Sequence, residues 1–93
     1  MSDIFRALND PTRRTILTLL RKRDMTAGEI AEHFPISKPS LSKHFNVLKE
    51  ADLIQGTRSE TTITYTLNVS VLEQALCGLL ETFKVKPRQK PAP

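Results

Sequence analysis

Two helix-start signals lie close together near the middle of this 93-residue chain. The first is Thr26 followed by Glu29, the spacing of a capping box, in which the hydroxyl accepts from the backbone N–H of the glutamate and the carboxylate reaches back. The second is Ser37, a residue well suited to the N-cap position. These signals predict helices over 27–34 and 38–51. Two short helices joined so closely favour a helix-turn-helix unit.

The remainder of the chain adds three helices and a hairpin. Apolar residues at helical spacing predict the helices, at residues 3–8, at 11–23 with Asp10 as cap, and at 71–84 with Asn68 or Ser70 as cap. After Ala51 the period changes to alternation, which predicts strands at 53–58 and 62–67 around a turn at 59–61. The order α-α-α-α-β-β-α predicts a mainly α fold with a β-hairpin, a winged helix-turn-helix domain over residues 1–84.

Length and composition are those of one small domain, since the chain is too short for two. No stretch approaches the roughly 20 apolar residues of a membrane span, and residues 1–3 do not look like the start of a signal peptide. We therefore expect a cytoplasmic protein without membrane insertion. Residues 85–93 hold three prolines and three basic side chains, which predicts a disordered tail. Such a tail is usually a solvated chain end, although it could add salt-sensitive affinity for DNA.

The net charge of +4 is by itself weak evidence for nucleic-acid binding. Four basic residues belong to the final ten residues, which carry no acid: Lys84, Lys86, Arg88 and Lys90. Residues 1–83 hold ten basic and ten acidic side chains and are formally neutral. Residues 35–49, by contrast, contain three lysines and no acid, so the helix-turn-helix unit has a local positive charge.

The second helix of this unit has a polar side suited to DNA. Leu41, Phe45 and Leu48 mark its inward side, and at 100° per residue the opposite arc is polar. The first turn of such a helix meets base edges first. The side chains that we expect at double-stranded DNA are serines, lysines and an asparagine: Ser37, Lys38, Ser40, Ser42, Lys43 and Asn46.

The hairpin is a second candidate contact. Arg58 lies beside its turn, where a wing would meet a phosphate or the minor groove. Glu60, in the turn, opposes a close approach of the whole tip. The alternative is a solvated hairpin that only closes the domain.

The first and last predicted helices carry more apolar side chains than a core of this size needs. These residues are Ile4, Phe5 and Leu8 in the first helix, and Leu72, Leu76, Leu79, Leu80 and Phe83 in the last. Either both helices cover the domain within a monomer, or they form the interface of a homodimer, which we favour. A two-fold dimer would set two recognition helices about 34 Å apart and bind a palindrome.

Catalytic, metal and cofactor sites are not indicated by the sequence. His33, His44 and the single Cys77 do not form a cluster with metal-ligand spacing. We expect His44 to be a hydrogen-bonded core residue and Cys77 to be a buried structural thiol, with a redox sensor as the alternative for Cys77. The chain lacks a nucleophile beside a base, paired carboxylates and a glycine-rich loop, so we expect neither an enzyme nor a cofactor.

Several ordered segments resemble the ArsR family of winged-helix repressors. They are Asp10–Arg14 with Ile16 and Leu17, Ser37–Phe45 with Leu48, Ala51–Ile54, and the hairpin end Tyr65–Asn68, which looks like the wing of that family. The resemblance covers roughly residues 3–83. It implies a DNA-binding repressor, a homodimer through the first and last helices, and a recognition helix that begins near Ser37.

The resemblance does not extend to the metal sites of that family. Where its best-known sensors carry two cysteines, this chain has Thr26 and Gly28, and the last helix lacks histidine. We therefore expect a repressor that does not sense metal. The stretch 25–34 looks closest to the SdpR-type autorepressors, which implies a membrane or soluble protein partner that sequesters the repressor.

Together these observations predict a sequence-specific transcriptional repressor that binds a palindromic operator as a dimer. The alternative is a winged-helix protein–protein interaction module without nucleic-acid binding, which the neutral total of residues 1–83 permits. The serine and lysine face of the second helix speaks against it, because hot spots in protein interfaces favour Trp, Tyr and Arg.

Overall fold

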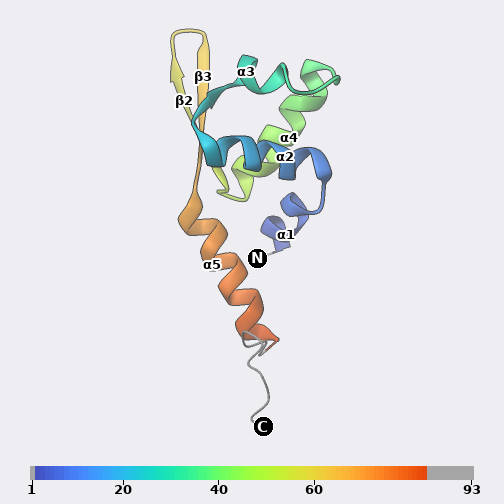
Figure 1. Ribbon diagram of the computed structural model, residues 1–93, viewed down its shortest axis with the longest axis vertical. Helices are drawn as coiled ribbons and strands as arrows, with labels where there is room; N and C mark the ends of the chain where they lie inside the picture. The colour runs from blue at the N-terminus through green and yellow to red at the C-terminus, as the bar shows by residue number, and fades with distance from the viewer. Residues whose placement is uncertain (1, 84–93) are drawn as a thin grey trace.

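The computed structural model describes residues 2–83, which form five helices and a three-stranded antiparallel sheet (Figure 1). In chain order the elements are α1 (Ser2–Leu8), α2 (Pro11–Lys22), β1 (Met25–Thr26), α3 (Ala27–Ala31), α4 (Lys38–Glu50), β2 (Ile54–Ser59), β3 (Thr62–Leu67) and α5 (Val69–Thr82). This order confirms the mainly α fold with a β-hairpin. The domain boundary expected at residue 84 and the disordered tail expected at 85–93 lie outside the described residues.

The sheet contains one strand that the sequence did not indicate. β1 pairs with β3, with Met25 opposite Tyr65 and Thr26 opposite Thr64, so β3 is the central strand in the order β1-β3-β2. A strand of two residues is too short to show alternation, and the ladder of β3 determines its conformation. β1 fixes the chain directly before α3, whose N-cap is Thr26.

Two helices differ from the predicted bounds by more than one residue, and the other three differ by one. α3 ends at Ala31 instead of residue 34, because the N–H groups of His33 and Phe34 bond to carbonyls three residues back, in tighter turns. α5 begins at Val69, two residues earlier than predicted. Asn68 occupies its N-cap position without a side-chain hydrogen bond, so the backbone that leaves β3 determines where this helix starts.

The predicted caps of α2, α3 and α4 are formed. The side chains of Asp10, Thr26 and Ser37 each accept a hydrogen bond from the backbone N–H three residues further on. Thr26 and Glu29 complete the capping box. These caps determine where α2, α3 and α4 begin, and hence the length of the turn inside the helix-turn-helix unit.

The core lies between the sheet and helices α2, α3 and α4. Its largest fully buried side chains are Ile16, Ile30, Leu48 and Leu53. Phe45 of α4 packs on Tyr65 of β3, with ring centroids 4.5 Å apart and an interplanar angle of 30°. Because this aromatic contact joins helix to sheet, the positions of α4 and of the hairpin depend on each other.

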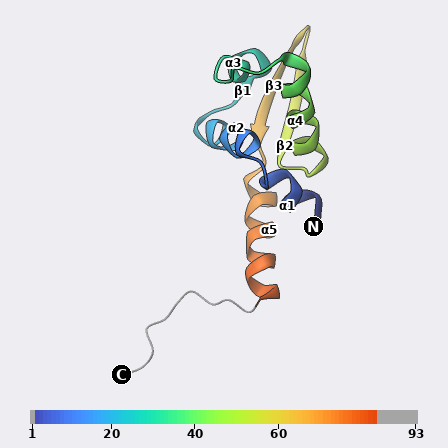
Figure 2. The same cartoon turned by 90° about the vertical axis from the view of Figure 1, so that its right-hand side faces the viewer.

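α5 leaves this body as an extended arm (Figures 1 and 2). Its first half is attached to the domain, since Ala75 is buried and Val71 and Leu72 pack against the core. Its second half points away from α2, α3 and α4 in both views. Every helix within residues 2–83 is too short or too polar to cross a membrane.

Candidate nucleic-acid interface

α4 presents one side to the core and the other to solvent. Leu41, Phe45 and Leu48 are 3%, 4% and 0% exposed and anchor the helix. The side chains predicted to meet DNA on this helix and its cap are all exposed: Ser37, Lys38, Ser40, Ser42, Lys43 and Asn46. The fold therefore leaves the polar side of α4 uncovered along its whole length.

The hydroxyl groups of Ser37 and Ser40, at the start of α4, differ in the hydrogen bonds that they can still make. The Ser37 hydroxyl oxygen accepts from the backbone N–H of Ser40 at 3.3 Å, and the Ser37 hydroxyl lies 3.0 Å from Ser40 Oγ, to which it donates. Ser37 is therefore occupied in capping. Ser40 keeps its own hydroxyl proton, so it is the serine with a donor available to an outside acceptor.

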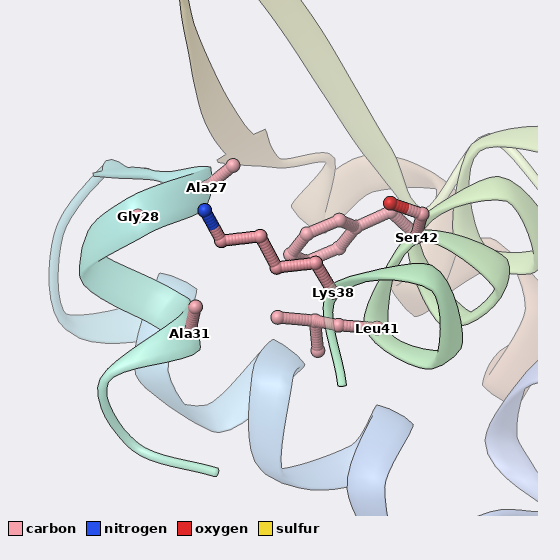
Figure 3. Close-up of a pocket in the computed structure, with 7 residues that line it drawn as sticks. Ala27, Gly28, Ala31, Lys38, Leu41 and Ser42 are labelled. Carbon is pink, nitrogen blue, oxygen red and sulfur yellow. The ribbon is translucent and has the colours of Figure 1, made fainter. Parts of the chain in front are cut away.

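A hollow of about 200 Å³ separates the start of α4 from α3 (Figure 3). Its lining is mainly apolar, and it consists of Ala27, Gly28, Ala31, Lys38, Leu41, Ser42 and Phe45. The Lys38 side chain extends across the hollow with its amine toward Ala27 and Gly28 (Figure 3). In this conformation the side chain lies over the surface toward the start of α3, and the contact of Lys38 with DNA stays a prediction.

The hairpin register places Arg58 on the helix side of the wing. Arg58 pairs with Ile63, and opposite residues in an antiparallel ladder share a face, as do alternate residues along a strand. Tyr65 belongs to the same face and packs on Phe45. Arg58 thus lies on the face turned toward α4. In both ribbon views the hairpin tip and the start of α4 lie at the end of the molecule away from α5 (Figures 1 and 2).

The turn of the wing is a two-residue loop between the paired residues Ser59 and Thr62. Glu60, its first residue, has a φ of 57°, and a positive φ at this position alone is typical of a type II′ turn, where glycine is favoured. The Glu60 side chain is exposed, so its charge reduces the attraction of the tip for phosphate.

Glu29, the acid that follows the lining residue Gly28 in the chain, is held by two hydrogen bonds. Glu29 accepts from the backbone N–H of Thr26 at 2.9 Å and from Arg23 Nη1 at 3.2 Å. These two bonds, the backbone one first, hold the pKa of Glu29 below its usual value. Because the Arg23 guanidinium partly neutralises the Glu29 carboxylate, there is no isolated negative charge at this position beside the start of α3.

The apolar residues predicted at a dimer interface fall into three groups. Those that pack against the core of the same chain are Ile4, Leu8 and Leu72, and those that are half-buried elsewhere are Phe5 and Leu79. Those that α5 leaves exposed are Leu76, Leu80 and Phe83, at 46%, 49% and 69%. Val69, which was not among the predicted interface residues, is 49% exposed and extends the same side of the helix.

The predictions for His44 and Cys77 differ in how they compare with the structure. His44 is half-buried, and its Nδ1 lies 3.0 Å from Nη1 of Arg13, so the predicted hydrogen bonding is confirmed. Cys77 is exposed in the single chain, and the prediction of a buried thiol is wrong there, because this part of α5 extends past the core. The contact of Arg13 was not predictable from the sequence, because nothing in its neighbours reveals a partner 31 residues away.

The comparisons with known proteins agree with this geometry. The family described as "Bacterial regulatory protein, arsR family" matches residues 10–55. The chain is 52% identical over 80 residues to the transcriptional repressor SdpR of Bacillus subtilis (strain 168), covering 86% of this chain and 89% of the relative. It is 34% identical over 73 residues to the arsenical resistance operon repressor of Staphylococcus xylosus, covering 78% and 70%.

Solved structures share the fold. A crystal structure of an ArsR family transcriptional regulator matches with a TM-score of 0.77 and 28% identity, covering 91% of this chain and 97% of that chain. An ArsR-like transcriptional regulator from Rhodococcus sp. RHA1 matches with a TM-score of 0.76 and 30% identity, covering 89% and 77%. These relatives are regulators rather than enzymes, as expected for this chain. Family match, sequence identity and fold together show that the chain belongs to the ArsR family and is a winged helix-turn-helix transcriptional repressor.

Proposed function

We propose that this repressor binds an inverted-repeat operator as a homodimer, with α4 in the major groove and the wing against the DNA backbone or the minor groove. The observation that carries the proposal is the uncovered polar side of α4, which contains no acid before Glu50. Ser42 and Asn46 can donate to and accept from base edges, and Lys43 can donate to a guanine or a phosphate. Arg58, on the α4 side of the wing, supports a second contact.

The homodimer is supported by an apolar strip on α5, which we define as Val69, Leu76, Leu80 and Phe83. Exposed apolar side chains along one side of a helix are typical of an interaction surface. A two-fold axis allows such a strip to pack on its own copy, and a second copy is present wherever the protein is made. The dimer would present two α4 helices to successive major grooves, about 34 Å apart.

We also propose that operator binding does not respond to metal ions. Thr26, at a position where metal-sensing relatives are expected to carry a cysteine, and His44 already make hydrogen bonds within the protein. The Thr26 hydroxyl accepts from the N–H of Glu29 at 3.1 Å, and His44 is bonded to Arg13. Gly28 has no side chain to offer a metal. Addition of Zn²⁺ is expected to leave the affinity unchanged. Release would then need another event, such as a protein partner that covers the polar side of α4.

The test is binding of the purified protein to the DNA upstream of its own coding sequence, across a salt series and with non-specific competitor DNA. We expect saturable binding that survives competitor and a footprint over an inverted repeat. Weak binding that salt abolishes equally on all DNA would contradict the proposal. That outcome would leave the chain as a winged-helix module that contacts a protein instead.

A further inference from the structure

The guanidinium of Arg13, in the first turn of α2, joins three helices. Nε donates to the carbonyl of Ala7 at 2.8 Å and Nη2 donates to the carbonyl of Arg6 at 2.9 Å, both at the end of α1. Nη1 lies 3.0 Å from Nδ1 of His44 on α4. A guanidinium has no acceptor atom, so Nδ1 of His44 accepts this bond and carries no proton in it. Arg13 thus bonds to α1 and to α4 with the two branches of one rigid group.

The contacts at α1 determine where this short helix lies. A seven-residue helix is not stable alone, and its last carbonyls lack partners within the helix. Arg13 takes two of these carbonyls, and Nη1 of the neighbouring Arg14 takes that of Leu8 at 2.8 Å. The end of α1 is therefore attached to α2 by two arginines, of which only Arg13 also reaches α4.

The contact at α4 lies directly behind the proposed DNA face. His44 follows Lys43 in sequence and is half-buried while Lys43 is exposed. The charged groups that the structure places at His44 are Arg13 and the carboxylate of Asp10, whose Oδ1 is 4.0 Å from Nδ1; both come from the start of α2. A shift of the imidazole would therefore carry the DNA face of the helix with it.

We propose that Arg13 is a positioning residue that sets the angle between α1 and α4, and thereby the half-site spacing that the dimer accepts. The inference rests on the proposed function: in both views α1 lies level with the first half of α5, which carries the proposed dimer surface, while the start of α4 lies at the opposite end of the molecule (Figures 1 and 2). In a two-fold dimer any rotation of α4 relative to the dimer end acts on both half-sites at once. A lysine cannot replace Arg13, because a single ammonium group lacks the separate, rigidly spaced nitrogen atoms that bond to α1 and to α4.

The test begins with selection of binding sites from random DNA by the wild-type protein. Affinity is then measured on the selected inverted repeat and on versions with one base pair added to or removed from the spacer. We expect wild type to prefer its own spacing by about tenfold, since half-site separation must match the protein symmetry. Arg13→Met and His44→Leu are expected to reduce that preference to below about threefold, while dimer dissociation and single half-site affinity stay within about twofold.

Two variants serve as matched controls. His44→Asn keeps an acceptor near the position of Nδ1 and should retain the wild-type spacing preference. Arg14→Met removes an arginine that holds α1 but does not touch α4, and it should also retain the preference. If Arg13→Met does not fold by circular dichroism, the two His44 variants still test the link.

Three results would overturn the inference. Unchanged spacing preference in His44→Leu would remove His44 from the link, and equal loss in Arg14→Met would show that holding α1 is sufficient. Selection of no inverted repeat by wild type would overturn the proposed function itself, before any variant is made, and the positioning role with it.

Discussion

Gly56 lies directly across the ladder from Tyr65, and a Cβ on Gly56 would approach the ring carbon Cε1 of Tyr65 at 3.1 Å and Cγ2 of Ile63 at 3.2 Å. The same tyrosine ring packs on Phe45 of α4, 4.5 Å away between centroids. Because Gly56 has no side chain, the Tyr65 ring can fit between the hairpin and the recognition helix. A change at this position affects the junction between sheet and helix.

Gly56→Ala is expected to lower the free energy of unfolding by about 1 to 3 kcal/mol, because the tyrosine ring has to move against a packed helix. Urea denaturation at neutral pH measures it. Gly28→Ala is the control, since a Cβ there meets only the Thr26 hydroxyl at 3.9 Å and helix propensity favours alanine by up to about 1 kcal/mol. Equal stability of Gly56→Ala and wild type would contradict the role of the glycine.

Asp52→Gly is expected to raise the free energy of unfolding by about 1 kcal/mol, because Asp52 has a φ of 59°, in the left-handed region. Asp52 N–H bonds to the Lys49 carbonyl and Leu53 N–H to that of Leu48, the pattern of a Schellman motif with its glycine position filled by aspartate. Asp52→Ala removes the charge and keeps the strain. A gain in Asp52→Ala as large as in Asp52→Gly would assign the effect to charge at the helix end instead.

Asp10 makes stability depend on pH. Partial burial acts to raise its pKa, but the hydrogen bond from the backbone N–H of Arg13 and the positive charge of the Arg13 guanidinium hold it below its usual value. The carboxylate therefore stabilises the fold above the unfolded-state pKa of about 4, and this contribution is lost as pH falls through the lower folded-state pKa.

Asp10→Asn should accordingly weaken the dependence of stability on pH below about 5, because asparagine keeps the N-cap but does not titrate. Asp10→Ala loses the cap as well and should cost about 1 kcal/mol at neutral pH. The urea midpoint measured from pH 7 to pH 3 checks both. Parallel curves for Asp10→Asn and wild type would show that another carboxylate causes the acid sensitivity.

Lys43→Ala is expected to weaken operator binding by about 1 to 3 kcal/mol if Lys43 contacts a base, and by less, on all sequences, if it contacts a phosphate. In the second case the salt slope should decrease by about 1. Lys22→Ala, an exposed lysine at the end of α2, is the charge-matched control. Wild-type affinity and salt slope in Lys43→Ala would remove this residue from the interface.

Leu80→Glu is expected to weaken dimer association by about tenfold or more, because it places a charge in the centre of the apolar strip. Gln74→Glu adds the same charge at an exposed position on another side of α5 and should leave association unchanged. Sedimentation velocity across a dilution series separates the two. A monomeric wild type, or equal association of both variants, would contradict the proposed interface.

The local elements were predictable because their causes lie within a few residues of one another. Thr26 and Ser37 start their helices through hydrogen bonds to N–H groups three residues on, so a short stretch of sequence contains both partners. The alternation after Ala51 likewise predicted the two paired strands of the hairpin, which the structure confirms as β2 and β3. The same local periodicity predicted the polar side of α4, and its exposure in the structure agrees with that prediction.

Other features depend on residues far away along the chain. β1 exists because β3 offers a ladder to Met25 and Thr26, and Cys77 is exposed because α5 extends beyond the body that would have covered it. The direction of Lys38 follows from the hollow beside α3. None of these has a signal in neighbouring residues, since each depends on which surfaces meet after folding.

Whether a feature could be predicted depends on how far apart in sequence the interacting residues lie. Caps, periodicity and turn preferences act between residues near in sequence, so they determined the order of elements, the inward side of each and the candidate DNA-binding face. The hydrogen bond between Arg13 and His44 spans 31 residues, and only the packing of α1, α2 and α4 decides it. A guanidinium can pair with many acceptors, so tertiary structure alone selects the ones within reach of its fixed geometry.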